Sequence, residues 1–206
     1  MIEVDNILDV ETYLDDIDVA IFDLDDTLYP EKEYVESGYR AIAKNYPYIH
    51  EMAERLWIAF ENQKKAIDVV LDEEGLLSEK ENCLKIYRFH LPEIHLYDGV
   101  RDMLQRLKSS KKLGIITDGR PEGQRAKLKA LQLEHLVDEI IITDELGGIE
   151  FRKPNEAAFR LMQAKLQIPF DRMAYIGDNI KKDFIAPDKL GMKSIYFRNQ
   201  KGIYIE

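Results

Sequence analysis

The sequence predicts an α/β protein: a parallel sheet with helices on both faces and one all-helical insertion. Three observations support this prediction. Short runs of β-branched and aromatic residues alternate with helical patterns over most of the chain. Such alternation indicates right-handed crossovers between parallel strands. From about residue 31 to residue 97, however, helical patterns follow one another without a convincing strand.

Five short runs are predicted to be buried strands, because apolar residues fill them and turn or helix signals bound them. They are Val19–Phe22, Leu113–Ile116, Ile140–Thr143, Met173–Ile176 and Ser194–Phe197. In a parallel sheet the carboxyl ends of such strands lie along one edge. Polar residues that directly follow the strands are therefore expected to meet there.

Helices are predicted between the strands, from apolar residues that recur at three- and four-residue steps. They cover about 100–107, 126–131, 158–166 and 180–190. Pro121 suits the first turn of the second helix, and Pro154 lies near the start of the third. Gly191 ends the fourth helix, in which Pro187 predicts an irregular or shortened last turn.

The insertion divides the chain into two predicted domains. It begins after Tyr29-Pro30 and ends at Asp98-Gly99, and both dipeptides favour turns. We therefore expect a core domain made of residues 1–29 and 99–206, and a helical domain over residues 30–98.

The composition narrows the classes of function. The 206 residues are 45% hydrophobic and 33% charged, as in a soluble globular protein. A formal net charge of -10 argues against nucleic-acid and anionic-membrane partners, since both require cationic surfaces. The single Cys83 excludes an internal disulfide framework. No signal peptide or membrane-spanning pattern is found, so a cytoplasmic location is expected, while the oligomeric state is left open.

Two carboxyl groups follow the first predicted strand, Asp23 and Asp25. An ionised aspartate can attack phosphorus, and a second carboxyl group can protonate the leaving oxygen and then deprotonate a water. Thr27 is expected to help hold this loop. A calcium-binding EF-hand would instead need glycine at its sixth position and an acid at its twelfth, where this sequence has Leu28 and Tyr34.

Anion-binding groups follow the next strands. Thr117 offers a hydroxyl group, and the backbone N–H groups of Asp118 and Gly119 are expected to face an anion near a helix start. Lys153, in a loop before a helix, would neutralise the nucleophile and a phosphoryl oxygen together. Taken alone, the Thr117–Gly119 segment also fits a turn or a helix cap, and Lys153 also fits a solvated surface position.

Asp178 and Asp183 carry oxygen ligands of the kind that Mg²⁺ prefers. One is expected to bind the metal, and the other to steady Lys153 or a water on the metal. Singly, each also fits an ordinary acid at a helix N-terminus. Four segments thus carry polar groups, those that begin with or contain Asp23, Thr117, Lys153 and Asp178. Together, in this order and each at a strand end, they indicate Mg²⁺-dependent phosphoryl transfer.

These segments resemble the four motifs of the haloacid dehalogenase superfamily, and the resemblance covers essentially the whole chain. The matching segments are Asp23–Leu28, Ile115–Gly119, Lys153-Pro154 and Gly177–Phe184, and Leu190–Ile195 is also similar to the family. The resemblance implies a Rossmann-like, doubly wound core. It also implies that residues 30–98 are a helical cap, of the subclass that carries its cap between the first and second motifs.

The resemblance further implies roles for the motif residues. Asp23 would be the nucleophile and a metal ligand, and Asp25 the general acid and base, with its backbone carbonyl on the metal. Asp178 would complete the Mg²⁺ site. The remaining roles are phosphate binding by Thr117, Asp118 and Lys153, and support of the site by Thr27, Gly119, Asn179 and Asp183. Asn179 stands where the family often has serine.

The predicted function is a Mg²⁺-dependent phosphatase that hydrolyses a small phosphomonoester through an aspartyl-phosphate. Nucleotides and sugar phosphates both remain open as substrates. The alternatives are a phosphosugar mutase, a phosphonate hydrolase and a non-catalytic receiver-like module that accepts phosphate. A dehalogenase is disfavoured, because halide departure needs no proton and Asp25 would then have no task.

Overall fold

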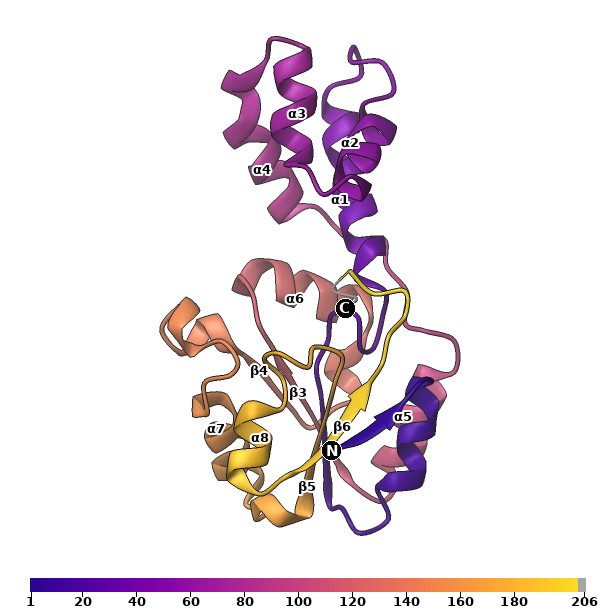
Figure 1. Cartoon of the computed structure of the whole chain (residues 1–206), viewed down its shortest axis with the longest axis vertical. Coiled ribbons are helices and arrows are strands. Elements are labelled where there is room, and N and C mark those ends of the chain that lie inside the picture. Colours follow the sequence, from indigo (N-terminus) through magenta and orange to yellow (C-terminus); the bar gives the residue numbers. More distant parts are fainter. Residues whose placement is uncertain (204–206) are drawn as a thin grey trace. The chain divides into compact units, whose positions relative to one another are not determined.

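The computed structural model describes residues 1–203 and divides the chain into two compact units. One unit combines Met1–Glu31 with the chain from His95 onward, and the other is Lys32–Ile94. Figure 1 shows both units, and the helical unit is drawn mostly in purple. Along the chain, this unit is inserted between the two segments that make up the other unit. The predicted core range 99–206 ends in three residues, 204–206, that lie outside the described part.

The first unit contains a six-stranded parallel sheet, which confirms the predicted α/β fold class. Its strands are β1 (Ile2–Val4), β2 (Val19–Phe22), β3 (Lys112–Thr117), β4 (Glu139–Ile142), β5 (Met173–Gly177) and β6 (Lys193–Phe197). Their order in the sheet is β1-β6-β5-β2-β3-β4. Strand β2 therefore lies between β3 and β5. The chain continues through β3 and β4 on one side of β2 and then through β5 and β6 on the other side, as in doubly wound sheets.

The five predicted strands agree with observed ones to within one residue at each end. Strand β4 lies one residue earlier than predicted, because Thr143 begins a 3-10 turn (Thr143–Leu146). Strand β1 was not predicted, since Ile2–Val4 is too short for a period of two to be recognised. It pairs with β6 at the edge of the sheet.

Helices connect the strands of this unit. They are α5 (Val100–Lys108), α6 (Pro121–Ala130), α7 (Ala157–Leu166) and α8 (Ile185–Leu190), with 3-10 segments η1 (Ile7–Tyr13), η3 (Leu133–His135), η4 (Thr143–Leu146), η5 (Ile149–Phe151) and η6 (Phe170–Arg172). Pro121 occupies the first turn of α6, as predicted. Pro154 precedes α7 by three residues.

The prediction of a helix over 180–190 was wrong at its start. Turns occupy residues 180–183, and α8 begins only at Ile185. The backbone N–H of Asp183 donates to the carbonyl of Asn179 at 2.9 Å, which closes a turn before the helix. Pro187 lies in the first turn of α8, where its missing N–H group is not needed, so the helix is shortened at its beginning and not at its end.

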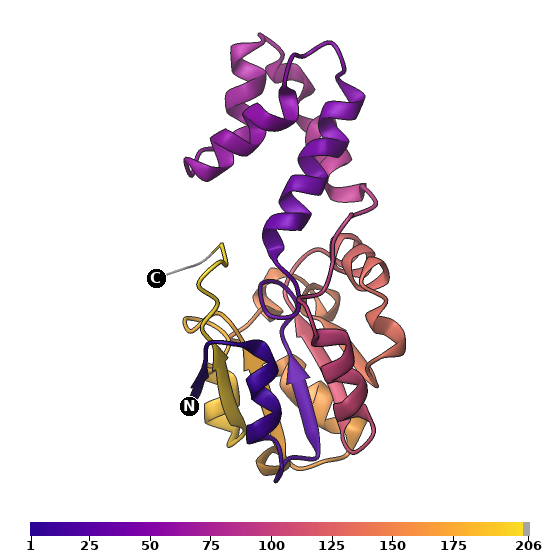
Figure 2. The same cartoon turned by 90° about the vertical axis from the view of Figure 1, so that its right-hand side faces the viewer.

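Helical segments cover both faces of the sheet. On one face, Phe159 and Met162 of α7 and Ala186 of α8 pack with Ile21 and Tyr175 in one buried apolar cluster. On the other face lie η1 and α5, which Figure 2 shows side by side in front of the sheet. A sheet buried on both faces explains why its central strands read as continuous apolar runs.

The second unit consists of helices, as the sequence predicts for this stretch. They are α1 (Glu31–Asn45), α2 (Met52–Glu61), α3 (Ala66–Glu73), η2 (Leu77–Glu79) and α4 (Lys80–Phe89). Its interior includes the buried side chains of Ile42, Leu56, Leu71 and Cys83. Within residues 1–203, no helix is both long and apolar enough to cross a membrane.

Phe159 gives a test of the packing on the α7 face. Its ring is 0% exposed and meets the Tyr175 ring edge-on, with centroids 5.0 Å apart. Phe159→Ala is expected to lower the free energy of unfolding by about 3–5 kcal/mol, because it leaves a cavity in the core. Urea denaturation measures this loss. Ile149→Ala is the control, since Ile149 is 72% exposed; equal losses in both variants would contradict the assigned core.

Candidate active site

Strand register brings three strand ends to one edge of the sheet. Phe22, the last residue of β2, lies opposite Ile115 in β3 and Ile176 in β5. Asp23 follows directly, and its backbone N–H donates to the carbonyl of Ile176 at 2.8 Å. The residues that end β3 and β5 therefore lie beside Asp23, as the sequence predicts for a parallel sheet.

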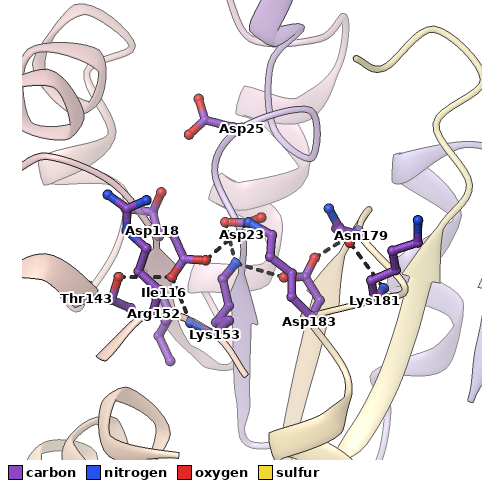
Figure 3. A network of polar contacts seen from close by, with 12 residues as sticks. Asp23, Asp25, Ile116, Asp118, Thr143, Arg152, Lys153, Asn179, Lys181 and Asp183 are labelled. Atoms are coloured by element: carbon purple, nitrogen blue, oxygen red, sulfur yellow. Dashed lines mark hydrogen bonds and ion pairs between the residues drawn. The ribbon is translucent and has the colours of Figure 1, made fainter. Parts of the chain in front are cut away.

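Lys153 is the centre of a buried ion-pair cluster (Figure 3). Its ammonium nitrogen lies 2.8 Å from Asp23 Oδ1 and 2.9 Å from Asp183 Oδ1. The same nitrogen donates to the Tyr175 hydroxyl group at 2.8 Å. An ammonium group has three N–H donors, so these three partners can use all of them.

Burial and charge act in opposite directions on Lys153. Burial lowers the pKa of its ammonium group, but the carboxylates of Asp183 and Asp23 raise that pKa well above its usual value. Lys153 is therefore a cation at neutral pH. Its charge neutralises part of the negative charge on both carboxylates.

Three carboxylates lie within reach of one metal ion. One oxygen from each of Asp23, Asp178 and Asp183 lies within 4.8 Å of the other two. Burial and the charge of Asp183 raise the pKa of Asp23 to about 6, against the opposing effect of Lys153. Burial and the charges of Asp23 and Asp183 raise the pKa of Asp178 to about 8. The cluster thus holds more negative charge than Lys153 balances, and these hard oxygen donors fit the expected Mg²⁺.

The loop after β2 helps to hold Asp178. The Thr27 hydroxyl group donates to Asp178 Oδ1 at 3.1 Å. The preceding Asp26 closes the loop: its Oδ1 accepts from the backbone N–H of Glu31 at 2.9 Å, and its Oδ2 from that of Ile203 at 2.7 Å. Thr27 therefore lies where the sequence predicts a supporting residue.

The turn after β5 fixes Asp183. Its Oδ2 accepts from the backbone N–H of Asn179 at 2.9 Å, while its other oxygen faces Lys153. Gly177 lies directly under this carboxyl group: a Cβ atom at Gly177 would be 2.8 Å from Asp183 Cγ. Only glycine leaves room for the carboxyl group in this position.

The Asp118 carboxylate fixes the loop that carries Lys153. Its Oδ1 accepts from the Thr143 hydroxyl group at 2.9 Å and from the backbone N–H of Lys153 at 3.0 Å. Its Oδ2 accepts from Lys182 Nζ at 3.2 Å. Burial would raise the pKa of Asp118, but the charges of Lys153 and Lys182 outweigh it and lower the pKa. Because these hydrogen bonds occupy the carboxylate, Asp118 would contact a phosphate through its backbone N–H group.

Asp25 lies apart from the cluster around Lys153, as Figure 3 shows. Its Oδ1 lies 2.6 Å from Lys127 Nζ and accepts a hydrogen bond from the Tyr29 hydroxyl group. Its Oδ2 accepts from Gln124 Nε2 at 2.8 Å. Burial would raise the pKa of Asp25, but Lys127 and the two hydrogen bonds outweigh it and lower the pKa. The structure thus holds Asp25 as a carboxylate.

Thr117 and Gly119 both lie beside the side chain of Gln124. The fully buried Thr117 Oγ1 accepts from Gln124 Nε2 at 2.5 Å. Gly119 has φ of +138°, which a residue with a side chain rarely adopts. A Cβ atom there would also lie 3.2 Å from Gln124 Cγ, so glycine suits this position for two reasons.

Comparison with known proteins agrees with this arrangement. A model of the haloacid dehalogenase-like hydrolases matches residues 20–197. The chain belongs to this family. The matched range includes all four motifs and both units of the structure. Membership in the haloacid dehalogenase-like family makes the protein a hydrolase.

Individual family members resemble the chain over most of its length. The glyceraldehyde 3-phosphate phosphatase of Methanocaldococcus jannaschii is 28% identical over 204 residues, which cover 89% of this chain and 85% of the relative. A haloacid dehalogenase-superfamily hydrolase of Geobacter sulfurreducens has a similar structure, with a TM-score of 0.69, 17% identity and coverage of 88% and 87%. The hydrolase YfnB of Bacillus subtilis, bound to magnesium, gives a TM-score of 0.64, 19% identity and coverage of 87% and 86%. Both structures share the fold.

Four site residues were missed by the sequence analysis: Gln124, Lys127, Tyr175 and Lys182. Gln124 and Lys127 lie in α6, where polar residues are expected to face solvent. Tyr175 lies in a buried strand, where an aromatic residue reads as core. A signal was available only for α6, since Lys127 and the apolar Leu128 lie three and four residues after Gln124 and share one helix face with it.

Gly177 gives a test of the cluster. Gly177→Ala is expected to displace the Asp183 carboxyl group and to lower the free energy of unfolding by about 1–3 kcal/mol, as overpacking of a core does. Gly114→Ala is a matched control in β3, on the other side of β2, because a Cβ atom there meets the flexible end of Met162. Urea denaturation measures both variants, and a crystal structure of Gly177→Ala would locate Asp183. A larger loss in the control would show that Asp183 is free to move aside.

Proposed function

We propose that this hydrolase is a Mg²⁺-dependent phosphatase that hydrolyses a small sugar phosphate through an aspartyl-phosphate on Asp23. The observation that carries the proposal is the ion pair between Lys153 and Asp23 beside two further carboxylates. A phosphate monoester resists attack because it is an anion, so an anionic nucleophile needs cations beside it. Lys153 supplies one of these cations at Asp23.

In the first step, Asp23 attacks phosphorus. Within the described residues, the contacts of its carboxylate with Lys153 and with the backbone N–H of Leu24 both involve Oδ1. Oδ2 is therefore the oxygen that forms the new O–P bond. The bond between phosphorus and the ester oxygen breaks, and the departing alkoxide takes a proton from Asp25, which has to enter this step protonated, in contrast to the carboxylate that its contacts favour in the free site.

In the second step, a water molecule attacks the phosphorus of the aspartyl-phosphate. Asp25, now a carboxylate, takes a proton from that water. The O–P bond to Asp23 breaks, which releases inorganic phosphate and restores the Asp23 carboxylate. The contacts of Asp25 with Lys127, Tyr29 and Gln124 suit this second step, because they stabilise the carboxylate that acts as the base.

Asp23 and Asp178 would hold Mg²⁺, together with the backbone carbonyl of Asp25. Bound there, the ion would neutralise negative charge on the phosphoryl group. Asp183, which is paired with Lys153 and bonded to Asn179, would support the site. Among the relatives, the Bacillus subtilis hydrolase with bound magnesium supports this choice of metal.

The phosphoryl oxygens would be bound by Thr117, by the backbone N–H groups of Asp118 and Gly119, and by the charge of Lys153. Thr117 ends β3, and Asp118 and Gly119 lie between β3 and α6, so the N-terminal end of a helix adds a favourable dipole. Because Lys153 already has three partners, its contribution is electrostatic or requires the exchange of one partner.

A sugar phosphate is favoured over a nucleotide. The Methanocaldococcus jannaschii relative acts on glyceraldehyde 3-phosphate by its name, and it matches nearly the whole chain. We propose that the helical unit is the cap that selects the leaving group, as the position of the insertion after the first motif indicates. A phosphosugar mutase would use the same aspartyl-phosphate but would pass it to a sugar hydroxyl group.

The first prediction concerns the nucleophile and the metal. The purified protein with Mg²⁺ is expected to release phosphate from p-nitrophenyl phosphate and from glyceraldehyde 3-phosphate, and chelation is expected to stop both reactions. Asp23→Asn should lose turnover and keep its unfolding midpoint, because the amide is a poor nucleophile of similar shape. Phosphate release and urea denaturation are the measurements. Retained turnover in Asp23→Asn would show that Asp23 is not the nucleophile. A native protein that accepts a phosphoryl group but releases no phosphate would favour a receiver-like module.

The second prediction concerns the general acid. Asp25→Asn is expected to lower hydrolysis of an aliphatic phosphate by about 10²–10⁴-fold, because an alkoxide leaves poorly without a proton. Hydrolysis of p-nitrophenyl phosphate should fall much less, since p-nitrophenolate leaves without one. Asn is preferred to Ala because it fills the space beside buried Lys127. Equal losses for both substrates would contradict the acid role.

A further inference from the structure

We propose that Lys127 and Gln124 are positioning residues that hold the general acid Asp25 in its working orientation, and that Gln124 couples it to the phosphate-binding Thr117. The proposal rests on the proposed function, because it takes the roles of Asp25 and Thr117 from there. It assigns a task to two buried polar side chains of α6 that no motif of the sequence includes.

Asp25 needs external support because of its place in the chain. It lies in the loop after β2, outside the named strands and helices, where only a single β-bridge to Tyr29 holds its backbone. The next residue, Asp26, has φ of +54°, so the backbone turns sharply just beyond Asp25. Contacts at the carboxylate itself must therefore set its orientation.

Lys127 provides the first of these contacts. Its side chain is 6% exposed, although lysine is rarely buried unless it is paired. Its Nζ lies 2.6 Å from Asp25 Oδ1. The cost of removing a full charge from water shows that this lysine is not an ordinary solvated residue of a helix surface.

Gln124 provides the second contact, one helical turn before Lys127. The single amide nitrogen donates to Asp25 Oδ2 at 2.8 Å and to Thr117 Oγ1 at 2.5 Å. The amide nitrogen, and not the amide oxygen, must face Asp25, because two oxygen acceptors in contact would repel each other. Gln124 therefore joins the general acid to the hydroxyl group expected at the phosphate.

The two contacts together hold both oxygens of Asp25 from one rigid helix. Helix α6 is ten residues long, and its buried Leu128 fixes the helix in the core. A misplacement of about 1 Å can cost a catalytic group about 10²-fold in rate. A clamp that fixes both carboxylate oxygens prevents such a displacement.

The two residues have different contacts, and this difference gives the test. The ion pair of Lys127 reaches Asp25, whereas the amide of Gln124 reaches both Asp25 and the proposed phosphate-binding Thr117. Loss of Lys127 should therefore impair proton transfer selectively. Loss of Gln124 should impair proton transfer and also weaken the binding of every phosphate ester.

The experiment measures kcat and KM with Mg²⁺ for phosphomonoesters whose leaving groups range from p-nitrophenol to aliphatic alcohols. In Lys127→Met we expect kcat/KM to fall by about 10²-fold for the poorest leaving groups and much less for p-nitrophenyl phosphate. The dependence on the leaving group should thus become steeper. Gln124→Leu should show the same change and, in addition, a raised KM throughout the series.

Lys129→Met is the matched control, because Lys129 is an exposed lysine of the same helix. It should leave the whole series unchanged. Asp25→Asn/Lys127→Met should be no slower than Asp25→Asn, since a positioning residue adds nothing once its target is gone. Unfolding midpoints of all variants show whether a loss reflects folding.

The outcomes separate the inference from the proposed function. If Asp25→Asn slows all esters equally, the acid role of Asp25 itself fails. If Asp25→Asn is selective for poor leaving groups and Lys127→Met slows all esters equally, Lys127 has a purely structural role and the inference is overturned. Additive losses in the double variant would overturn it as well.

Discussion

The buried ammonium group of Lys153 is the interaction on which the rest of the site depends. Removal of a charge from water costs several kcal/mol unless partners satisfy it completely. Here the Tyr175 hydroxyl group accepts a hydrogen bond from the ammonium nitrogen, and carboxylate oxygens of Asp23 and Asp183 lie 2.8 Å and 2.9 Å from it, so three groups together compensate the buried charge. Their positions come from three sources: the end of β2, a turn after β5 and the interior of β5. The sheet and the ion-pair cluster therefore require each other.

The charge balance of the cluster explains how an acidic protein can take an anionic substrate. Lys153 is one cation among several carboxylates, and burial together with the neighbouring negative charges raises the pKa values of Asp23 and Asp178. A divalent metal would offset the negative charge that Lys153 leaves on the three carboxylates, within a molecule whose net charge is -10. Attraction of a phosphate would then depend on the metal, and not on the surface of the protein.

The sequence predicted the parts of the site that follow from sheet geometry. Acids at the ends of apolar runs had to meet, because parallel strands align their carboxyl ends, and Asp23 and Asp178 do so. The partners of these acids could not be predicted, since they depend on which side chains of a helix turn inward. Lys127 reads as a solvated lysine until α6 is placed on the loop after β2. The shorter α8 has a similar cause, because the turn that holds Asp183 replaces the first turn of the predicted helix.

The two buried lysines divide the electrostatic work of the site. Lys153 neutralises Asp23, the proposed nucleophile, which must be an anion to attack, while Lys127 neutralises Asp25, the proposed acid, which must exchange a proton. If one lysine served both acids, a proton bound to Asp25 would shift the charge felt by the nucleophile. Separate partners weaken this coupling, because each carboxylate is balanced by its own cation a hydrogen-bond distance away. The amide of Gln124 is neutral, so it joins Asp25 to Thr117 and fixes their geometry without adding a charge. The fold thus places nucleophile and acid two residues apart in the chain and still gives each its own electrostatic environment.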